Sequence, residues 1–482
     1  MSPDSLNINI TAVLPEILLT GLAISVLILD FFLPKGKKQL LGYIGIIGLF
    51  VLLPVVWTTQ NAIPAFGETV VSDTLSSFFD TIFIIAGILT LIISIDYSKK
   101  GNIHKGEYYP IILIAILGMM VIASSNDLLT LYVGLELMAI SFYVLIAYRQ
   151  NETRSAEGAL KYFVLGGLSS GIILYGITFA YGVGGTTNLQ GISNQVAHID
   201  VHDPFLLLSI VFITAGLSFK IALFPFHLWA PDAYQGAPPP ITALLSVGSK
   251  AAAFSIFFRI FIIAFHELHP QWSNLLWPLS AATMVFGSVV AISQKNIIRM
   301  MAYSSIAHAG MIMIGLLVNS RAGMAGMLYY LLVYTFMNMG VFAVVTILAK
   351  DNGRGENIED YQGLASRQPM LAFFLTLFLL ALIGVPPTGG FTAKFFIFAA
   401  AIEAGYYGIA IIGVAATAVA LFFYTRIIFY MYMKEPQGSD DTVTPGKATR
   451  IALFIAGTGI AILGLYPSPF MRFLEKAIQI YF

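Results

Sequence analysis

Hydrophobic residues recur along the whole chain in runs of about 20, separated by short polar stretches. Each run is long enough for a helix to cross the roughly 30 Å hydrocarbon core of a bilayer. Such runs lie at 12–33, 39–57, 75–95, 110–125, 127–148, 158–182, 204–228, 240–265, 274–293, 297–318, 324–349, 369–400, 406–433 and 450–467. The pattern predicts an all-α integral membrane protein of about 14 transmembrane helices, with no soluble domain between them.

The composition indicates the same class of protein. Of 482 residues, 58% are hydrophobic and 10% are charged, whereas a soluble domain carries about 25% charged residues. Most of the outer surface is therefore expected to face lipid. The chain has no cysteine, which excludes cysteine-ligated iron–sulfur clusters, disulfides and thiol catalysis. Dinucleotide-binding and P-loop motifs are also absent from the sequence, so we expect no cofactor and no metal in this chain.

Lysine and arginine residues favour alternate loops between the predicted spans. Because cytoplasmic loops of membrane proteins are enriched in these residues, we expect the N-terminus and the C-terminus on the outer side of the plasma (inner) membrane. The first apolar run begins near Thr11 without a preceding basic region, which favours a retained span over a signal peptide.

The tail after Pro469 is amphipathic as a helix. Its apolar face would consist of Phe470, Phe473, Leu474, Ala477, Ile478 and Tyr481. Such a helix is typical of the membrane–water interface, and a partner-binding helix is the alternative.

Several ionisable residues fall inside the predicted spans. Glu136, Lys250 and His308 lie roughly 13–16 Å from the starts of their spans, close to the bilayer midplane. A charged side chain there costs about 2.5–3.5 kcal/mol on insertion scales. We therefore expect these side chains to face one another, or water, inside the helix bundle.

Each of these residues also has a purely structural interpretation. Lys161 and Arg426 near cytoplasmic ends, and Arg259 near an outer end, could extend to the bilayer surface, and Asp80 could be a helix-end contact. His227 and His308 could be buried imidazoles with satisfied hydrogen bonds. The remaining charges could form ion pairs that fix packing. Since Lys220, Lys250 and Lys394 outnumber the single Glu136, they cannot all be paired, which favours a proton relay.

Two of the predicted spans are interrupted by proline. Pro225 follows Lys220 and precedes His227, and the pair Pro386–Pro387 shortly precedes Lys394. Proline removes a backbone donor and breaks a helix. Irregular backbone at membrane depth is tolerated only inside protein or beside a water-filled cavity. Both breaks are therefore expected to mark hydrated places, each with a lysine nearby.

The positions of the breaks predict an internal repeat. A three-helix segment (1–109) precedes a five-helix repeat (110–265) and a second five-helix repeat (274–433), and the last span and the tail occupy 434–482. The broken helix is the fourth in each repeat. Because five is odd, the second repeat is expected to be inverted relative to the first, which is typical of transporters.

Five ordered segments carry a resemblance to a known family. They are DLLTLYVGLELMAISFYVLIAYR, EGALKYFVLGGLSSGIILYG, GLSFKIALFPFHLWAPDAYQGAPPPITALLSVGSKAAAF, QKNIIRMMAYSSIAHAGMIMIG and GVPPTGGFTAKF. Together they resemble the antiporter-like membrane subunits of NADH–quinone oxidoreductase (respiratory complex I). Within that family, Lys394 and the lack of a long lateral helix after the last span are typical of subunit N.

The resemblance implies a proton-translocating membrane subunit and roles for seven residues. Glu136 would be the fifth-span glutamate, paired with Lys220; Lys250 would be the central lysine and Lys394 the terminal one; His227, His308 and Lys161 would belong to the hydrated axis. The partners would be other membrane subunits of complex I and the lipid bilayer, with no nucleic acid. NADH, FMN, iron–sulfur clusters and quinone would bind in the partner subunits.

Three other functions remain open from the sequence. The first is a subunit of a multi-subunit cation/proton antiporter or of a membrane-bound hydrogenase, both built on a related scaffold. The second is a cytochrome b-like haem anchor, which needs pairs of histidines on facing helices, whereas only His227 and His308 lie within spans. The third is a passive scaffold that bridges neighbouring subunits.

Overall fold

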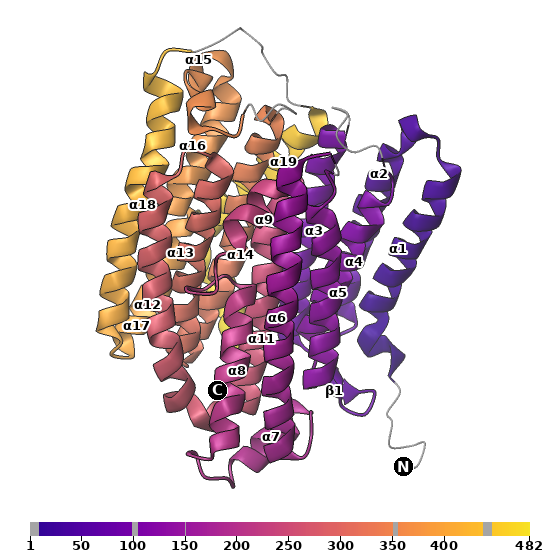
Figure 1. Ribbon diagram of the computed structural model, residues 1–482, viewed down its shortest axis with the longest axis vertical. Helices are drawn as coiled ribbons and strands as arrows, with labels where there is room; N and C mark the ends of the chain where they lie inside the picture. The colour runs from indigo at the N-terminus through magenta and orange to yellow at the C-terminus, as the bar shows by residue number, and fades with distance from the viewer. Residues whose placement is uncertain (1–8, 99–104, 150, 350–354, 437–445) are drawn as a thin grey trace.

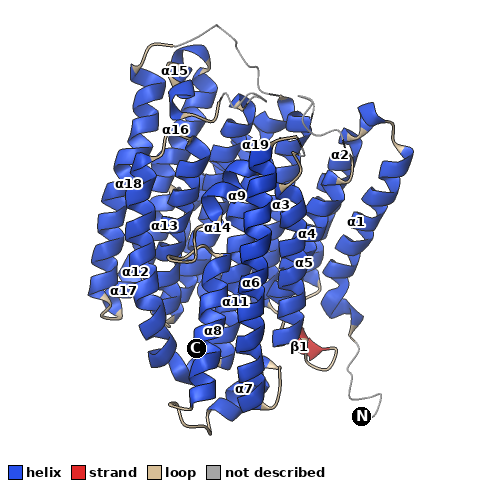
Figure 2. Ribbon diagram, in the orientation of Figure 1, coloured by secondary structure: helices blue, strands red, loops and turns tan. Residues whose placement is uncertain are grey.

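The computed structural model is a bundle of long helices that run along one common direction (Figure 1). It describes residues 9–98, 105–149, 151–349, 355–436 and 446–482. Helix is by far the main secondary structure, and a small strand region near one end of the bundle is the exception visible in Figure 2. The basic loop at 35–38 and helix α15 (Leu364–Arg367) belong to one end, and the start of α1 (Leu14–Phe32) and α7 (Leu189–Val196) lie at the other.

The long helices account for most of the predicted spans. They are α1 (Leu14–Phe32), α2 (Gln39–Thr58), α3 (Thr74–Tyr97), α4 (Tyr108–Ser124), α5 (Leu128–Ile146), α6 (Thr153–Gly184), α8 (Pro204–Lys220), the continuous helical segment Pro239–Ala264 that contains α11 (Lys250–Phe258), α12 (His269–Ser293), α13 (Ile297–Leu317), α14 (Arg321–Leu348), α16 (Pro369–Ile383), α17 (Gly389–Glu403), α18 (Tyr407–Met433) and α19 (Lys447–Leu465).

Shorter elements connect or extend these helices. They are η2 (Ile10–Val13), η3 (Lys35–Lys37), α9 (Ala230–Gly236), α10 (Pro239–Leu244), the π-helical segments η5 (Leu245–Ser249) and η6 (Arg259–Ala264), η7 (His266–Leu268), η8 (Ile358–Tyr361), α20 (Pro467–Ala477) and η9 (Gln479–Tyr481), with strands β1 (Asn61–Ala65) and β2 (Val70–Ser72). Strands β1 and β2 form a small antiparallel hairpin that the sequence did not indicate.

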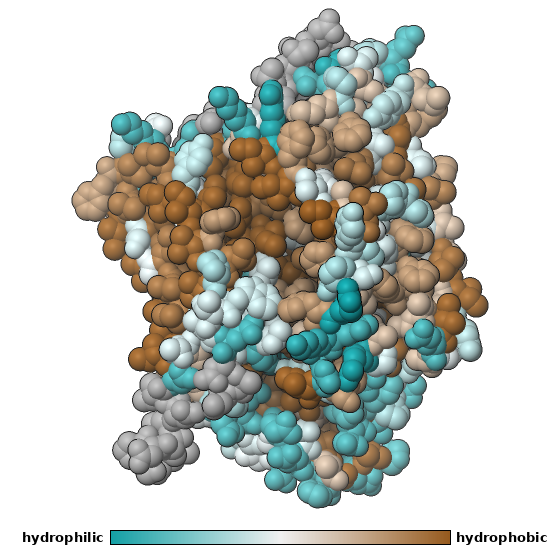
Figure 3. Space-filling view, turned by 180° about the vertical axis from the view of Figure 1, so that it is seen from behind, coloured by the Kyte–Doolittle hydropathy of each residue, from teal (hydrophilic) through white to brown (hydrophobic). Residues whose placement is uncertain are grey.

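The predicted class, a helical multi-pass membrane protein, is confirmed. In the described residues, 11 helical segments are long and apolar enough to cross a bilayer, and α4, α8 and α16 are shorter apolar helices. Large hydrophobic side chains such as Phe31, Phe50 and Ile411 are exposed on the outside of the bundle. Hydrophobic residues cover much of the middle of the face seen in Figure 3, and hydrophilic residues gather toward its ends. The number of crossings stays a prediction.

Two isolated backbone bridges lie at corresponding positions of the two predicted repeats. The inverted repeat and its domain boundaries stay predictions. The first bridge joins Asp127 to Asn188 and the second bridge joins Asn296 to Asn357. Asp127 and Asn296 each precede a helix and accept hydrogen bonds from its first backbone N–H groups, which are otherwise unpaired. The same kind of side-chain N-cap therefore begins α5 and α13, which are the second helices of the two predicted repeats.

The tail helix α20 packs against its own chain. Met471, Leu474, Ala477 and Ile478 are buried, and α20 contacts α14. Of the predicted apolar face, Phe473 remains partly exposed. The amphipathic pattern is therefore used, at least in part, for packing within the subunit.

Candidate functional site

The first predicted helix break lies where Pro225 indicated. Helix α8 ends at Lys220, and regular helix resumes at Ala230 in α9. The last carbonyl groups of a helix need partners from outside it. One of them, at Phe219, accepts a hydrogen bond of 2.9 Å from the Trp229 indole. The break thus holds Lys220 at the end of a helix in the interior, with 2% of its surface exposed.

The second helix break also places a buried lysine beside the free end of a helix. Helix α16 ends at Ile383, Gly384 adopts a left-handed conformation with φ of +91°, and α17 begins at Gly389. The Lys394 ammonium group donates hydrogen bonds of 2.9 Å to the carbonyl groups of Leu382 and Ile383. The lysine therefore satisfies the free carbonyl groups that the break leaves at the end of α16.

Lys220 and Glu136 are linked through a serine. The Lys220 Nζ donates a hydrogen bond of 3.2 Å to the Ser170 hydroxyl, and this hydroxyl donates to the Glu136 carboxylate. Ser170 lies on α6, between α5 and α8. A direct ion pair, which the resemblance implied, is absent between these two described residues. Ser170 is thus a member of the site that the sequence did not single out.

Lys250 lies deeper in the bundle, at the junction of η5 and α11. It is almost fully buried, and its Nζ donates a hydrogen bond of 2.6 Å to the backbone carbonyl of Ser305 on α13. The Ser305 hydroxyl lies 3.1 Å from the hydroxyl of Tyr234 on α9. These contacts connect the central lysine to the short helix that follows the first break.

His308 has two tyrosine partners. Its Nδ1 lies 2.7 Å from the Tyr330 hydroxyl, and its Nε2 lies 3.3 Å from the Tyr424 hydroxyl. The Tyr424 hydroxyl also contacts the Ser304 hydroxyl. An imidazole flanked by two groups that can donate or accept is able to pass a proton through either nitrogen.

His227 has different surroundings. Its ring lies 4.5 Å from that of Phe286 and 5.5 Å from that of Phe224. Its Nδ1 is buried and has no hydrogen-bond partner within the described chain. His227 is therefore close to the first break, but no hydrogen bond between described residues links it to the lysines.

Lys161 belongs to a charged cluster near one end of the bundle. Its Nζ lies 2.6 Å from Glu157 and 2.7 Å from Asp232, and Asp232 pairs with Arg299 at 2.6 Å. The Lys161 side chain is 43% exposed on the surface of the chain. Asp232 lies on α9, the helix that also carries Tyr234. One short helix therefore carries both a member of this cluster and the tyrosine that contacts Ser305.

A polar cavity of about 370 Å³ adjoins this cluster. Its lining residues are Arg154, Gln235, Gln294, Lys295, Asn296, Arg299, Glu356 and Asn357. Burial raises the pKa of the Glu356 carboxyl from its ordinary value, while Arg149 and a hydrogen bond from Asn296 act in the opposite direction. A second cavity, of about 480 Å³, reaches Lys394 and includes Glu403 and Thr417 among mostly apolar lining residues.

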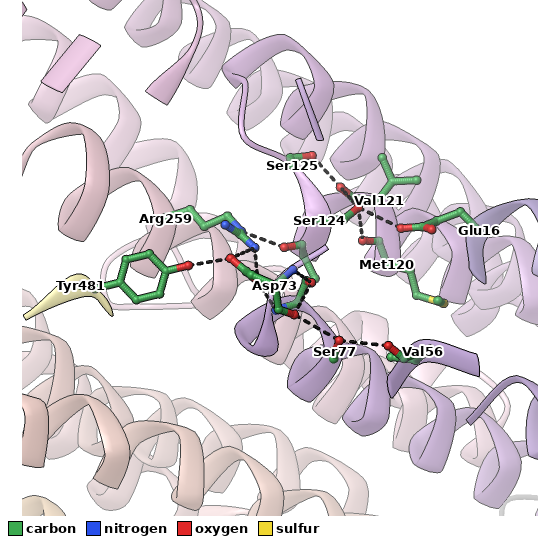
Figure 4. A network of polar contacts seen from close by, with 12 residues as sticks. Glu16, Val56, Asp73, Ser77, Met120, Val121, Ser124, Ser125, Arg259 and Tyr481 are labelled. Carbon is green, nitrogen blue, oxygen red and sulfur yellow. Dashed lines mark hydrogen bonds and ion pairs between the residues drawn. The ribbon is translucent and has the colours of Figure 1, made fainter. Parts of the chain in front are cut away.

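Arg259 and Asp80 differ from what the sequence suggested. Arg259 is 1% exposed and forms an ion pair with Asp73 at 3.0 Å, so it does not extend to the bilayer surface. Asp80 lies inside α3, seven residues beyond its N-cap Asp73, and is also buried. The interpretation of Arg259 was wrong because residues 73 and 259 meet in space although they are far apart in the chain (Figure 4).

Hydroxyl groups are what sequence reasoning missed at the site. Ser170, Tyr234, Ser305, Tyr330 and Tyr424 make the hydrogen bonds described above, yet hydroxyl residues are common in membrane helices and often bond to their own backbone. In the described part of the chain, His, Asp and Glu residues form no group of three that could hold a metal ion.

Comparison with known proteins assigns this arrangement to a class. Residues 125–420 match the family model described as "NADH:quinone oxidoreductase/Mrp antiporter, TM". The match spans more than half of the chain and includes both helix breaks. The chain belongs to this family of antiporter-like membrane subunits, which confirms the resemblance drawn from the motifs.

Individual relatives narrow the similarity further. The chain is 40% identical to NADH-quinone oxidoreductase subunit N of Trichlorobacter lovleyi over 98% of both chains. It is 38% identical to F(420)H(2) dehydrogenase subunit N of Methanosarcina mazei over 97% of this chain and 98% of that one. Among solved structures, a chain of respiratory complex I from Thermus thermophilus is 30% identical with a TM-score of 0.81, covering 95% of this chain and 98% of that one.

Proposed function

We propose that this chain is the proton-translocating membrane subunit of an NADH–quinone oxidoreductase, with buried Glu, Lys and His residues as its relay. The observation that carries the proposal is the placement of Lys220 and Lys394 at the two helix breaks, each buried and each held by one or two hydrogen bonds. A buried lysine held in this way can exist with or without its extra proton, which a relay requires.

Proton uptake begins at the exposed cluster of Lys161, Glu157 and Asp232. Support comes from its exposure on the surface of the chain and from its position on α6 and α9, which also carry Ser170 and Tyr234. By the distribution of lysine and arginine, this end faces the cytoplasm, and the two termini face outward from the plasma membrane.

The switch of the relay is the group Glu136–Ser170–Lys220. While Glu136 is ionised, its negative charge favours the protonated form of Lys220, and the Ser170 hydroxyl transmits the interaction. When a change in a neighbouring subunit draws Glu136 away, this stabilisation is lost. Lys220 then releases its proton toward the interior.

The proton continues along Lys250, His308 and Lys394. Two sets of contacts support this path. Lys250 donates to the backbone carbonyl of Ser305, and the imidazole of His308 contacts the hydroxyl groups of Tyr330 and Tyr424. The gaps between these groups exceed single hydrogen bonds, so water completes the path. His227 takes part through such water next to the first break.

The energy for transport comes from partner subunits. Moving one charge against 100 mV costs about 2.3 kcal/mol, which is comparable to the loss of one partly buried charged hydrogen bond. In this proposal, the redox reactions take place in the partner subunits, which bind NADH, FMN, iron–sulfur clusters and quinone. Those partners are other membrane subunits of the same complex.

Replacement of Lys220 or Glu136 by Ala in the assembled complex tests the proposal. The complex is reconstituted in liposomes, and proton uptake is measured per electron delivered to quinone. We expect fewer protons per electron in both variants. Lys37→Ala, which changes an exposed lysine that does not line the polar cavity, is the matched control. Unchanged proton stoichiometry in Lys220→Ala and Glu136→Ala would show that the relay assignment is wrong.

A multi-subunit cation/proton antiporter or a membrane-bound hydrogenase is the second candidate, favoured by the breadth of the family to which the chain belongs. The similarity to a F(420)H(2) dehydrogenase subunit shows that relatives with other electron donors share this scaffold. The neighbouring genes decide between these candidates. Genes for NADH-binding and quinone-binding subunits support our proposal, and genes for small antiporter subunits support the alternative.

A further inference from the structure

The polar cavity of about 370 Å³ beside the charged cluster has basic walls. Among the described residues, Arg154, Lys295 and Arg299 line it, and Glu356 is the one acidic residue of the lining. Arg299 also pairs with Asp232 outside the cavity, so the basic residues outnumber the acidic ones even when that partner is included. The proposed relay passes through none of the lining residues and leaves this excess of positive charge without a role.

Separate parts of the chain form the walls of the cavity. On one side, α9 approaches the start of α6 so closely that an added Cβ at Gly236 would lie 2.7 Å from the Arg154 carbonyl oxygen. On the other side, the Ile358 N–H donates a hydrogen bond of 2.9 Å to the Lys295 carbonyl. Packing of the backbone therefore brings Arg154 and Lys295 to one space, and the basic residues do not all come from a single loop.

The basic side chains have donors to spare. Within the described part of the chain, the side chains of Arg154 and Lys295 form no ion pair or hydrogen bond. Arg299 uses its Nη1 for Asp232, at 2.6 Å, and for the amide oxygen of Gln235, at 3.2 Å. Its Nε and Nη2 make no hydrogen bond with a described residue. Three side chains thus offer N–H groups to a ligand from different walls.

Glu356 does not cancel this positive charge. Its Oε2 accepts a hydrogen bond of 3.2 Å from the Asn296 amide, and its side chain is buried. Burial raises the pKa of the Glu356 carboxyl, while Arg149, which is not a lining residue, acts in the opposite direction. The carboxyl group therefore has stabilising partners other than Lys295 and Arg299, which stay available to an anion.

We propose that this cavity binds a phosphate group. Guanidinium groups pair strongly with oxyanions, and a phosphate group has several acceptor oxygens that can receive donors from different walls at once. A carboxylate has two oxygens in one plane and would use fewer of these donors. Inorganic phosphate and the headgroup of an anionic phospholipid share this chemistry, so the test has one arm for each source. The proposal does not depend on the lysine relay.

Thermal unfolding of the assembled complex in lipid nanodiscs tests the site, with loss of this subunit from the complex as the signal. A ligand that binds the folded protein raises its unfolding temperature. In the first arm, inorganic phosphate or chloride is added at equal ionic strength to complexes in phosphatidylcholine nanodiscs. In the second arm, phosphatidylglycerol replaces part of the phosphatidylcholine, and no phosphate is added.

The variants are Arg154→Gln and Lys295→Gln, which keep a polar side chain and remove the charge. Lys37→Gln is the matched control, because Lys37 is exposed and does not line the cavity. We expect phosphate, phosphatidylglycerol or both to raise the unfolding temperature of the parent and of Lys37→Gln. The rise should fall to less than half in each cavity variant. A response in the first arm alone identifies the free anion, and a response in the second arm alone identifies the phospholipid.

Three results would overturn the proposal: no rise in either arm, a rise of equal size in the parent and both cavity variants, or an equal effect of chloride, which would indicate general screening. If a cavity variant does not assemble, chemical modification of lysines in the parent decides. Phosphate or phosphatidylglycerol should slow the modification of Lys295 by an amine-reactive reagent at least two-fold relative to Lys37. Equal modification rates with and without both ligands would contradict the site.

Discussion

The ammonium group of Lys220 contacts the hydroxyl of Ser170 at 3.2 Å. The same hydroxyl donates to Glu136, so the acid and the base of the proposed switch share one small group between them. A hydroxyl can rotate and reverse its role as donor and acceptor. The link can therefore break without movement of a helix, whereas a direct ion pair would require separation of two charged side chains.

Ser170→Ala should weaken the coupling between Glu136 and Lys220. Hydrogen bonds to charged groups contribute about 1.5–3 kcal/mol, so we expect proton transfer to slow by roughly ten-fold or more. The measurement is the initial rate of proton uptake by liposomes that contain the complex, relative to quinone reduction. Ser170→Thr keeps a hydroxyl and is the control. Equal rates in Ser170→Ala and the parent would remove Ser170 from the mechanism.

Tyr234→Phe should slow the return of a proton to Lys250. The Tyr234 hydroxyl lies 3.1 Å from that of Ser305, whose carbonyl accepts from Lys250. Loss of one neutral hydrogen bond is worth about 1 kcal/mol, which predicts a roughly five-fold slower steady-state turnover. Tyr175→Phe changes an exposed tyrosine and should leave turnover at the parental value. Normal turnover in both variants would mean that the proton reaches Lys250 by another path.

Gly384→Ala should destabilise the second helix break. Gly384 has a φ of +91°, and an added Cβ would lie 3.1 Å from the Lys394 side chain. Strain of this kind costs about 1–3 kcal/mol. The unfolding temperature of the purified complex is measured, with loss of this subunit from the complex as the signal. Gly167→Ala on α6 meets no atom within 4 Å and should be neutral or stabilising. Equal unfolding temperatures would contradict the strained geometry at Gly384.

Arg259→Gln should destabilise the subunit more than the double variant with Asp73→Asn. Removing one member of a buried ion pair leaves an uncompensated charge and costs about 3–5 kcal/mol, whereas removing both costs much less. The double-variant cycle, measured by thermal unfolding, isolates this coupling. Asn at position 73 can still cap α3. Additive effects of the two substitutions would show that the pair at 3.0 Å contributes little.

The helix breaks were predictable because proline has a local effect. Helix α8 ends at Lys220, shortly before Pro225, and α16 ends at Ile383, shortly before Pro386. The burial of Lys220 and Lys394 was predictable as well, since both lie in apolar runs. These features depend on neighbouring residues in the chain, which a sequence displays directly.

The partners of the buried groups were not predictable. Ser170 is separated from Lys220 by 50 residues, and Arg259 from Asp73 by 186. Such contacts depend on how helices are placed around one another, and many serines and aspartates have similar local sequences. The hairpin of β1 and β2 was missed because the stretch before Asp73 lacks a clear alternation of polar and apolar residues.

The number of protons taken up per electron in a Lys250→Met complex tests the central claim most directly. Lys250 is almost fully buried and lies between the two helix breaks in the proposed order, so every proton must pass it. The account predicts a lower proton-to-electron ratio with the complex still assembled, and the parental ratio in the control Lys37→Met. A parental ratio in Lys250→Met, in complexes shown to contain this subunit, would contradict the relay.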